Sequence, residues 1–358
     1  MNSFVFVVCQ AGAEPVLKSE VAKNHPELRF AYSRPGFVTF KWLGEHSLPP
    51  DFRLESVFGR AYAISLGKVK LSSPDFLEQI TSWTDLLAPS AKKLRLHVYE
   101  RDQHKPGEEP LGYEFGNWKK KLYRKVSKLD RFLVEEKARV GDIVLNLVAV
   151  EEDEVWGGYF TQEEPHSPFA GGRIPVDYPK EAPSRAYLKL EEALIWSGAP
   201  VRTGDTAVEI GSAPGGASYA LLKRGLTVIG IDPGEMDPVV LEFIRRGKFQ
   251  HFKLPVAQVI REDLPKVIDW LLVDMNVTPH VALSSLDRLI VKAGSSLQGV
   301  FATVKLSQWK VAKEIPALMD WVKHMGMSKV RATQLPSHKQ EILIYGLTRN
   351  GIRRPGSV

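Results

Sequence analysis

The segment from Thr206 to Gly225 joins a short apolar stretch to a glycine-rich loop and then to a helical pattern. It reads TAVEIGSAPGGASYALLKRG, with glycines at 211, 215 and 216. Glycines at the carboxyl end of a strand let a ligand approach the backbone closely, and ligands of open α/β sheets bind at this end. The sequence therefore predicts a binding loop here. A tight turn that needs glycine only for its geometry is the alternative.

This loop favours a nucleoside cofactor other than a nicotinamide dinucleotide. In the dinucleotide pattern G-x-G-x-x-G the second glycine stands where this chain has Ala213, and Pro214 follows. The next predicted strand, 227–231, is followed by Asp232, whose carboxylate can accept hydrogen bonds from ribose hydroxyls. The loop and the acid together predict a nucleoside cofactor.

Four ionisable residues occupy equivalent places around the predicted sheet: Lys189, Asp274, Lys305 and Glu341. The first lies early in a predicted helix, the next two end apolar strands, and the last begins one. Strand ends at one edge of a doubly wound sheet converge on the ligand crevice, and a charge that ends a buried strand costs stability unless it is paired. Their positions indicate a functional cluster. For each residue taken alone, a charge that marks where a strand reaches water is the simpler interpretation.

The part of the chain after residue 184 has to position these residues, and its pattern alternates between strand and helix. A helix is predicted from Ser184 or Arg185. Strands are then predicted at 206–210, 227–231, 249–253, 267–273, 300–305, 328–333 and 341–348, and helices at 216–224, 238–246, 281–293 and 308–325. Near-continuous apolar strands fit a buried parallel sheet between helices, and the two close final strands fit an antiparallel hairpin at its edge.

The first 165 residues mix shorter strand and helix signals. Strands are predicted at 4–9, 36–42, 61–66, 94–99 and 143–150, and helices at 14–23, 76–86 and 117–128. This mixture predicts two small α+β units, over 1–60 and 61–165. The proline- and glycine-rich stretch 166–184 has no helix or strand periodicity and is predicted to be a linker before the domain 185–358.

The segment 116–131, GNWKKKLYRKVSKLDR, holds seven basic residues against one acid. Such a surface could neutralise phosphates, and the interleaved Trp118 and Tyr123 could stack on bases. The solvated face of an amphipathic helix that buries Leu122, Val126 and Leu129 is an equally good interpretation. The candidate RNA contacts are Lys119, Lys120, Lys121, Arg124 and Lys125.

Composition sets limits on the class of protein. The net charge is +6 with a pI near 9.1, which is compatible with a polyanionic partner but does not establish one. The single cysteine, Cys9, excludes intrachain disulfides and any CxxC motif. No stretch approaches the ~20 apolar residues that span a bilayer, and the short apolar run near the N-terminus is predicted to be a strand. A cytoplasmic location is therefore expected, with neither membrane nor metal as a partner.

Six motifs follow one another from His166 onward: HSPFAGG, APSRAYLKLEEA, IGSAPGG, VDM, VKL and QEILIYG. In this order they resemble the FtsJ/RrmJ-like RNA 2′-O-methyltransferases, and most closely the branch that methylates a cytidine ribose of bacterial 23S rRNA. The resemblance is strong from His166 to the end of the chain. Over the first 160 residues it is weaker, where AGAEPVLKSEVA and SRPGFVTF resemble the family's N-terminal α+β domain.

The resemblance implies an α/β, Rossmann-like class I S-adenosylmethionine (SAM) methyltransferase domain, preceded by ferredoxin-like and THUMP-like RNA-binding units. It implies SAM as cofactor and 23S rRNA or a precursor of the large subunit as partner. The implied cofactor contacts are Ser184, Glu209, Gly211, Ser212, Ala213, Pro214, Gly215, Gly216, Asp232 and Asp274. Glu209 stands where many methyltransferases have Asp, and the stretch LPVAQVIRED does not identify the acid that often meets the adenine.

By the same resemblance Lys305 is the base that removes the ribose proton, within a catalytic set that includes Lys189, Asp274 and Glu341. A lysine pKa of about 10.4 is too high for a neutral amine near pH 7; burial and the second amine would lower it, and the two carboxylates would oppose them. Two other functions stay open: an RNA-binding protein with a degenerate methyltransferase fold, and a SAM enzyme that methylates an RNA base. Four intact positions argue against the first. The second often carries Asn/Asp-Pro-Pro-Tyr/Phe where this chain reads DMNVTP.

Overall fold

The computed structural model describes residues 4–88, 93–105, 118–133, 137–163 and 166–356. The chain divides into two compact units, unit 1 over Met1–Arg173 and unit 2 over Ile174–Val358, each described below by itself. No helix in the described ranges is long and apolar enough to cross a membrane.

In the described part of unit 1, eight strands form one sheet in the order β2-β3-β1-β4-β8-β7-β5-β6. The pairs are antiparallel except β5 with β6 and with β7. The strands are β1 Phe4–Val8, β2 Leu28–Arg34, β3 Phe37–Trp42, β4 Ala61–Lys70, β5 Leu94–Glu100, β6 Phe132–Leu133, β7 Ile143–Glu151 and β8 Glu154–Thr161. Because β1 pairs with β4, the segments on either side of residue 60 share this sheet.

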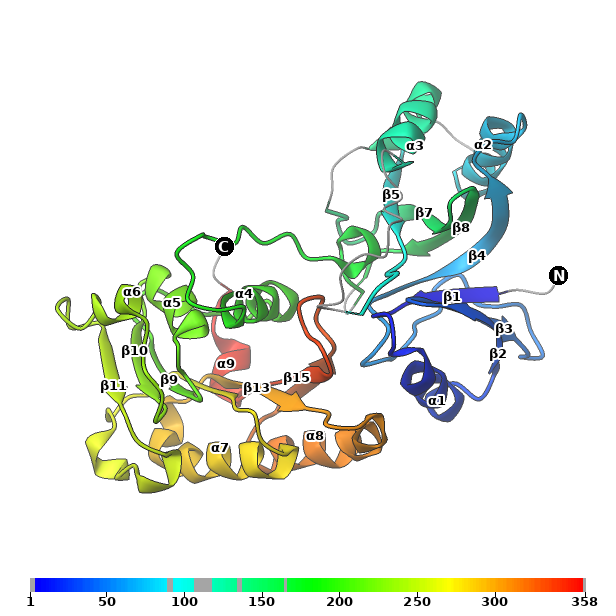
Figure 1. The fold of residues 1–358 in the computed structure, drawn as a ribbon. Helices are drawn as coiled ribbons and strands as arrows, with labels where there is room; N and C mark the ends of the chain where they lie inside the picture. Colours follow the sequence, from blue (N-terminus) through cyan, green and yellow to red (C-terminus); the bar gives the residue numbers. More distant parts are fainter. Residues whose placement is uncertain (1–3, 89–92, 106–117, 134–136, 164–165, 357–358) are drawn as a thin grey trace. The chain divides into compact units, whose positions relative to one another are not determined.

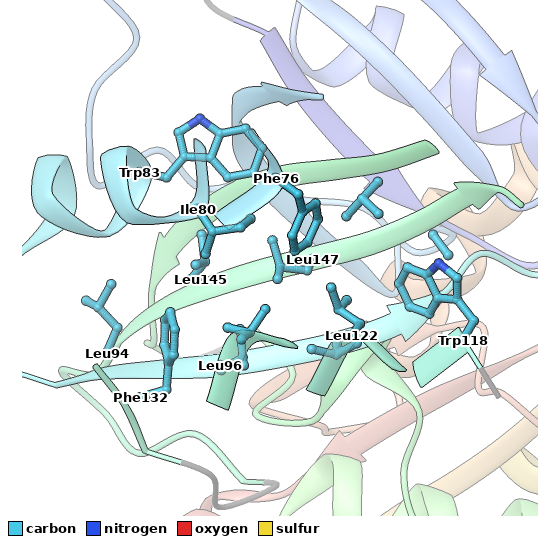
Figure 2. Close-up of a cluster of buried hydrophobic side chains, with 14 of the residues drawn as sticks. Phe76, Ile80, Trp83, Leu94, Leu96, Trp118, Leu122, Phe132, Leu145 and Leu147 are labelled. Atoms are coloured by element: carbon cyan, nitrogen blue, oxygen red, sulfur yellow. The ribbon is translucent and has the colours of Figure 1, made fainter. Parts of the chain in front are cut away.

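Helices α1 Glu14–Asn24, α2 Phe76–Leu87 and α3 Trp118–Val126 accompany the sheet of unit 1 (Figure 1). Helix α2 buries Phe76, Ile80 and Trp83, which are spaced by four and three residues and so share one face. Figure 2 shows these side chains packed with the buried Trp118 and Leu122 of α3 over strands β5 and β7. One apolar core therefore anchors both helices.

The predicted linker 166–184 is divided between the two units. In unit 1, the ring of His166 stacks on Tyr62 with centroids 4.4 Å apart, and the 3-10 turn η2, Ala170–Gly172, packs beside β5. In unit 2, the Tyr219 hydroxyl donates to Glu181 Oε1 over 3.2 Å. Both halves of the stretch are thus fixed by contacts although neither has helix or strand periodicity.

The described part of unit 2 contains a seven-stranded sheet in the order β11-β10-β9-β12-β13-β15-β14. All neighbours are parallel except that β15 runs antiparallel to β13 and to β14. The strands are β9 Thr206–Ile210, β10 Thr227–Ile231, β11 Phe249–Phe252, β12 Trp270–Asp274, β13 Gly299–Lys305, β14 Lys329–Thr333 and β15 Glu341–Leu347. This is a Rossmann-like sheet with an edge hairpin, so the predicted α/β, Rossmann-like fold of this unit is confirmed.

Helices cover both faces of this sheet, with α4 and α5 on one side and α7 and α8 on the other (Figure 1). They are α4 Ala186–Ser197, α5 Gly216–Lys223, α6 Pro238–Leu241, α7 Pro279–Ala293, α8 Ile315–His324 and α9 Arg349–Arg353. Two predicted helices are shorter than expected. The helix expected over 238–246 stops at Leu241 and continues as turns, and the first part of 308–325 is the 3-10 helix η6, Trp309–Glu314. Proline lies in the first turn of α8, where its missing N–H costs nothing.

Candidate active site

The glycine loop leaves β9 at Ile210 and enters α5 at Gly216. Gly211 has φ +81° and Gly215 has φ +110°, conformations that favour glycine. The Gly211 amide donates to the carbonyl of Ile231 over 2.9 Å, so the loop is tied to the end of β10. Gly211 and Ala213 remain partly exposed and Pro214 is exposed, whereas Ser212, Gly215 and Gly216 are buried. A ligand at this edge of the sheet therefore meets backbone.

Three of the loop glycines are also required by the protein's own packing. A Cβ at Gly211 would lie 2.5 Å from the carbonyl oxygen of Asp274, and one at Gly216 would collide with Ser184. A Cβ at Gly215 would lie 2.7 Å from the Val240 side chain. A side chain at position 211 would thus displace the end of β12 as well as the loop, which couples the loop mechanically to Asp274.

Two predicted cofactor acids have different surroundings. Asp232, directly after β10, is partly exposed, and its Oδ1 accepts the Gly234 N–H over 2.7 Å. Glu209 is 2% exposed and accepts the Ser218 hydroxyl over 2.5 Å. Burial, with the nearby carboxylates of Asp274 and Asp232, raises the pKa of Glu209 to about 8. Of these two acids, only Asp232 presents a partly exposed carboxylate.

The structure brings the four ionisable residues into one closed ring of charges. Lys189 Nζ lies 3.2 Å from Asp274 Oδ2 and 2.8 Å from Glu341 Oε1. Lys305 Nζ lies 2.8 Å from Asp274 Oδ1 and also contacts Glu341 Oε2. Each amine therefore meets both carboxylates, and each carboxylate uses one oxygen for each amine. We call these four residues the charge ring.

The sheet topology explains why Glu341, which begins a strand, lies beside Asp274 and Lys305, which end strands. Asp274 and Lys305 end the parallel strands β12 and β13, which are neighbours in the sheet. Strand β15 runs the opposite way, and its first residue, Glu341, pairs directly with Lys305. Lys189 comes from α4, which covers the same edge. The reversed strand is therefore what places the second carboxylate in the ring.

The charge ring shifts the pKa values of two of its members, Lys305 and Glu341. Burial lowers the pKa of the Lys305 amine, but the carboxylates of Asp274 and Glu341 raise it by more, so its pKa lies above the usual lysine value. Burial raises the pKa of Glu341, but His338, which is itself protonated only below about pH 4, and the amines of Lys189 and Lys305 outweigh burial and hold this pKa at about 2. At neutral pH Lys305 is therefore an ammonium group and Glu341 a carboxylate.

His338, which the sequence reasoning missed, is buried beside this ring. Its Nδ1 accepts the Leu335 N–H over 3.2 Å, so the neutral ring carries its proton on Nε2, for which the described residues offer no partner. Burial lowers the pKa of His338 to about 4, and the imidazole is neutral at pH 7. A histidine three residues before a predicted site acid was the available signal.

The predicted RNA contacts of unit 1 lie on α3. Lys119, Lys120, Lys121 and Arg124 are exposed, and we call these four residues the basic face. Lys125 differs, since its Nζ donates to the Leu71 carbonyl over 2.8 Å and lies over the Phe76 ring.

Trp118, which was expected among the exposed basic residues, is buried instead. Trp118 is 4% exposed and packs in the core, so the idea that it stacks on bases is wrong. It lies on the face of α3 that it shares with the buried Leu122 and Val126. Residues 116 and 117 of the predicted segment lie outside the described ranges.

None of the described residues forms a cluster of His, Cys, Asp and Glu that could hold a metal ion. The fit of SAM rests instead on the exposed backbone of the glycine loop and on Asp232 one strand away. Together these groups supply close backbone approach and a carboxylate acceptor for ribose hydroxyls, which an adenosyl group requires. The loop and the charge ring lie at the same carboxyl edge of one sheet.

Comparisons with known proteins find similarity to methyltransferases. Residues 182–325 match the family of FtsJ-like methyltransferases. "Ribosomal RNA large subunit methyltransferase M" of Tolumonas auensis is 27% identical over 369 residues, and that of Sodalis glossinidius 26% over 372 residues; each alignment covers 96% of both chains. TrmN from Thermus thermophilus covers 96% of this chain and 99% of its own at 14% identity and a TM-score of 0.34, a likeness too low to carry an argument.

Proposed function

We propose that this chain, whose residues 182–325 match the FtsJ-like methyltransferases, methylates the ribose 2′-hydroxyl of RNA, most specifically of a cytidine in 23S rRNA. The observation that carries the proposal is the charge ring of Lys189, Asp274, Lys305 and Glu341 at the sheet edge that also holds the glycine loop. Two amines and two carboxylates in alternation can orient a hydroxyl and receive its proton.

The cofactor is SAM, and when bound it supplies an electrophilic methyl group on a cationic sulfonium. The backbone of Gly211 and Ala213 and the side chain of Asp232 would hold it. Three of the other predicted contacts would support the loop without touching the cofactor. Ser184 packs against Gly216, and Ser212 and Glu209 are buried. Asp274 belongs to both sets, because its carboxylate is in the charge ring and its carbonyl touches Gly211.

Lys305 is proposed to receive the ribose proton. Because its pKa is raised, its Nζ carries three protons and no lone pair, so one of these protons has to leave before the amine can accept the ribose proton. The Asp274 carboxylate, 2.8 Å away, is positioned to take that proton. The ribose oxygen thus gains the methyl group, and its proton ends within the ring. A hydroxyl oxygen becomes strongly acidic as the methyl bond forms, so a weak base suffices late in the step.

The expected RNA substrate rests on the relatives named ribosomal RNA large subunit methyltransferase M, which align over nearly the whole chain. In unit 1, the basic face of α3 offers four exposed cations that could contact phosphates. We propose that the ferredoxin-like segment 1–60 and the THUMP-like segment 61–165 bind the RNA, and that the enzyme works in the cytoplasm.

The decisive experiment maps 2′-O-methyl groups in 23S rRNA from cells with and without the gene, followed by repair with the purified enzyme and SAM. Digestion to nucleosides then assigns the methyl group: ribose methylation yields 2′-O-methylcytidine, and base methylation yields a methylated base on an unmodified ribose. A methylated base would replace this proposal by the base-methyltransferase alternative. Binding of RNA without any methyl transfer would indicate a degenerate enzyme.

A further inference from the structure

The charge ring spans two elements that are far apart in sequence, and its geometry depends on how they are joined. Lys189 comes from α4, and Glu341 begins β15 directly after the loop 334–340. Their contact is 2.8 Å long. A shift of α4 against this loop would open the ring, since misplacement by about 1 Å can cost 10²-fold in rate.

Glu192 of α4 and Arg185, the N-cap residue just before this helix, hold that loop at Ser337. Arg185 Nη2 donates to the Ser337 carbonyl over 2.9 Å. Glu192 Oε2 accepts both the Ser337 N–H, over 2.9 Å, and the Ser337 hydroxyl, over 2.7 Å. Glu192 and Ser337 are 6% and 8% exposed, so these bonds are shielded from water. Both backbone polar groups of Ser337, its N–H and its carbonyl, are thus bound by Glu192 of α4 and by the N-cap residue of the same helix.

Lys189 lies between Arg185 and Glu192 in the sequence, the two residues that bind Ser337. Positions 185, 189 and 192 differ by four and three residues, which puts them on one face of an α-helix. The loop itself is fixed internally: Gln334 Nε2 donates to the Lys339 carbonyl over 2.9 Å, and the His338 N–H donates to the Leu335 carbonyl over 3.0 Å. A loop fixed in this way transmits the position of Ser337 to Glu341.

We propose that Arg185 and Glu192 are positioning residues, which clamp Ser337 so that Lys189 and Glu341 stay at ion-pair distance in the charge ring. This inference rests on the proposed function, because the ring is its catalytic site. The clamp acts through Lys189 and Glu341, and neither of its residues has to touch the substrate.

The test compares Glu192→Ala and Glu192→Gln with Glu191→Gln. Glu191 is a matched control: it directly precedes Glu192 in α4, is 7% exposed, and pairs with Arg224 instead of the loop. Single-turnover methylation of total rRNA from cells lacking the gene should slow about 10- to 100-fold in Glu192→Ala. Glu192→Gln, whose amide oxygen still accepts from Ser337, should recover most of the rate. Glu191→Gln should lower the melting temperature and leave the rate unchanged.

A double variant separates positioning from a general loss of structure. In a Lys189→Ala background Glu192→Ala should cost little more, because the clamp acts through the residue already removed. Equal costs in both backgrounds, or a wild-type rate in Glu192→Ala, would overturn the clamp. If Glu192→Ala does not fold, Ser337→Ala decides instead, since it removes only the hydroxyl bond and should give a smaller loss of rate.

Hydrogen exchange tests the clamp without any methyl transfer. The Ser337 amide should be protected in the wild-type protein, should exchange faster in Glu192→Ala, and should stay protected in Glu191→Gln. Unchanged protection in Glu192→Ala would overturn the clamp even in an inactive enzyme. A wild-type protein that transfers no methyl group but shows this exchange pattern would remove the proposed function and leave the clamp standing.

Discussion

The charge ring of unit 2 and the basic face of unit 1 both consist of charged side chains, but their charges are arranged in opposite ways. In the ring every charge is partly or wholly buried and meets two opposite charges. On the basic face the cations Lys119, Lys120, Lys121 and Arg124 point to solvent with like-charged neighbours. The ring should therefore act through geometry and fail as a unit. The basic face should act through summed charge, and each loss should be partial and dependent on salt.

The largest effect is expected at Lys305. Lys305→Ala should slow methyl transfer on the order of 10²–10⁴-fold, the usual range for loss of a general base. Binding of S-adenosylhomocysteine and of RNA should persist, since neither depends on this amine. Single-turnover assays at saturating RNA and SAM isolate the step. Lys310→Ala, which removes an exposed lysine five residues later, is the matched control and should be neutral. Near-wild-type transfer by Lys305→Ala would remove the ring mechanism while leaving the cofactor loop intact.

A second prediction tests whether the ring acts as a unit. Lys189→Ala and Glu341→Ala should each slow turnover by roughly 10- to 100-fold, because each leaves buried charges with one partner fewer. The double variant should be hardly slower than the worse single variant, since the residues share one function. If the two fold-losses of rate multiply instead, Lys189 and Glu341 contribute independently. The ring would then resemble the basic face, whose losses are expected to add.

The basic face should give the opposite result. Changing Lys119, Lys120 and Lys121 to Ala should weaken RNA binding and reduce the salt dependence, with a change in slope of up to ~0.9 per lost phosphate contact on a duplex. The three single losses should add, and the affinity for S-adenosylhomocysteine should not change. Lys23→Ala removes an exposed lysine of α1 and serves as the one-charge control for Lys120→Ala. If the salt dependence of RNA binding is unaltered in the triple variant, the basic face does not contact phosphates and is only a solvated helix surface.

The fold of unit 2 could be predicted because its strands are short apolar runs separated by helical periodicity. The strands β2 and β8 of unit 1 were missed for physical reasons. Strand β2, LRFAYSR, buries only its first residue, and β8, EVWGGYFT, is interrupted by two glycines. The α-helix expected over 308–325 begins only at Ile315, because the six residues before it form the 3-10 helix η6. Local pattern cannot reveal strands whose pairing, rather than their own periodicity, makes them strands.

In the candidate site too, single residues could be predicted from local sequence, but the contacts between distant segments could not. The four ring residues could be proposed from motifs, but their closure depends on β15 reversing beside β13, which spacing does not state. The clamp was missed because Glu192 and Ser337 are 145 residues apart in sequence. Charged residues at 185, 189 and 192 on one helix face were the only local sign. A long-range hydrogen bond leaves little trace in a single sequence.

The smallest expected effect concerns two buried glutamates of unit 2, Glu341 and Glu209, whose pKa values are shifted in opposite directions. Glu341 has a pKa held at about 2, so it is ionised in both the folded and the unfolded chain above pH 5 and adds no pH dependence there. Glu209 has a pKa raised to about 8. As pH rises from about 4.5 towards 8, the unfolded chain releases this proton while the folded chain keeps it, so the free energy of unfolding falls.

Glu209→Gln should therefore be more stable than the wild type by an amount that grows between pH 5 and pH 8. The melting temperatures of the cofactor-free proteins measure this difference, and a change of roughly 2–4 °C per kcal/mol is expected for a unit of this size. Glu341→Gln is the matched control, and its difference from the wild type should stay constant over the same range. A constant difference for Glu209→Gln would mean that Glu209 is ionised in the folded protein. The Ser218 hydroxyl, its 2.5 Å partner, would then be donating to a carboxylate, and both glutamates would carry charge at neutral pH.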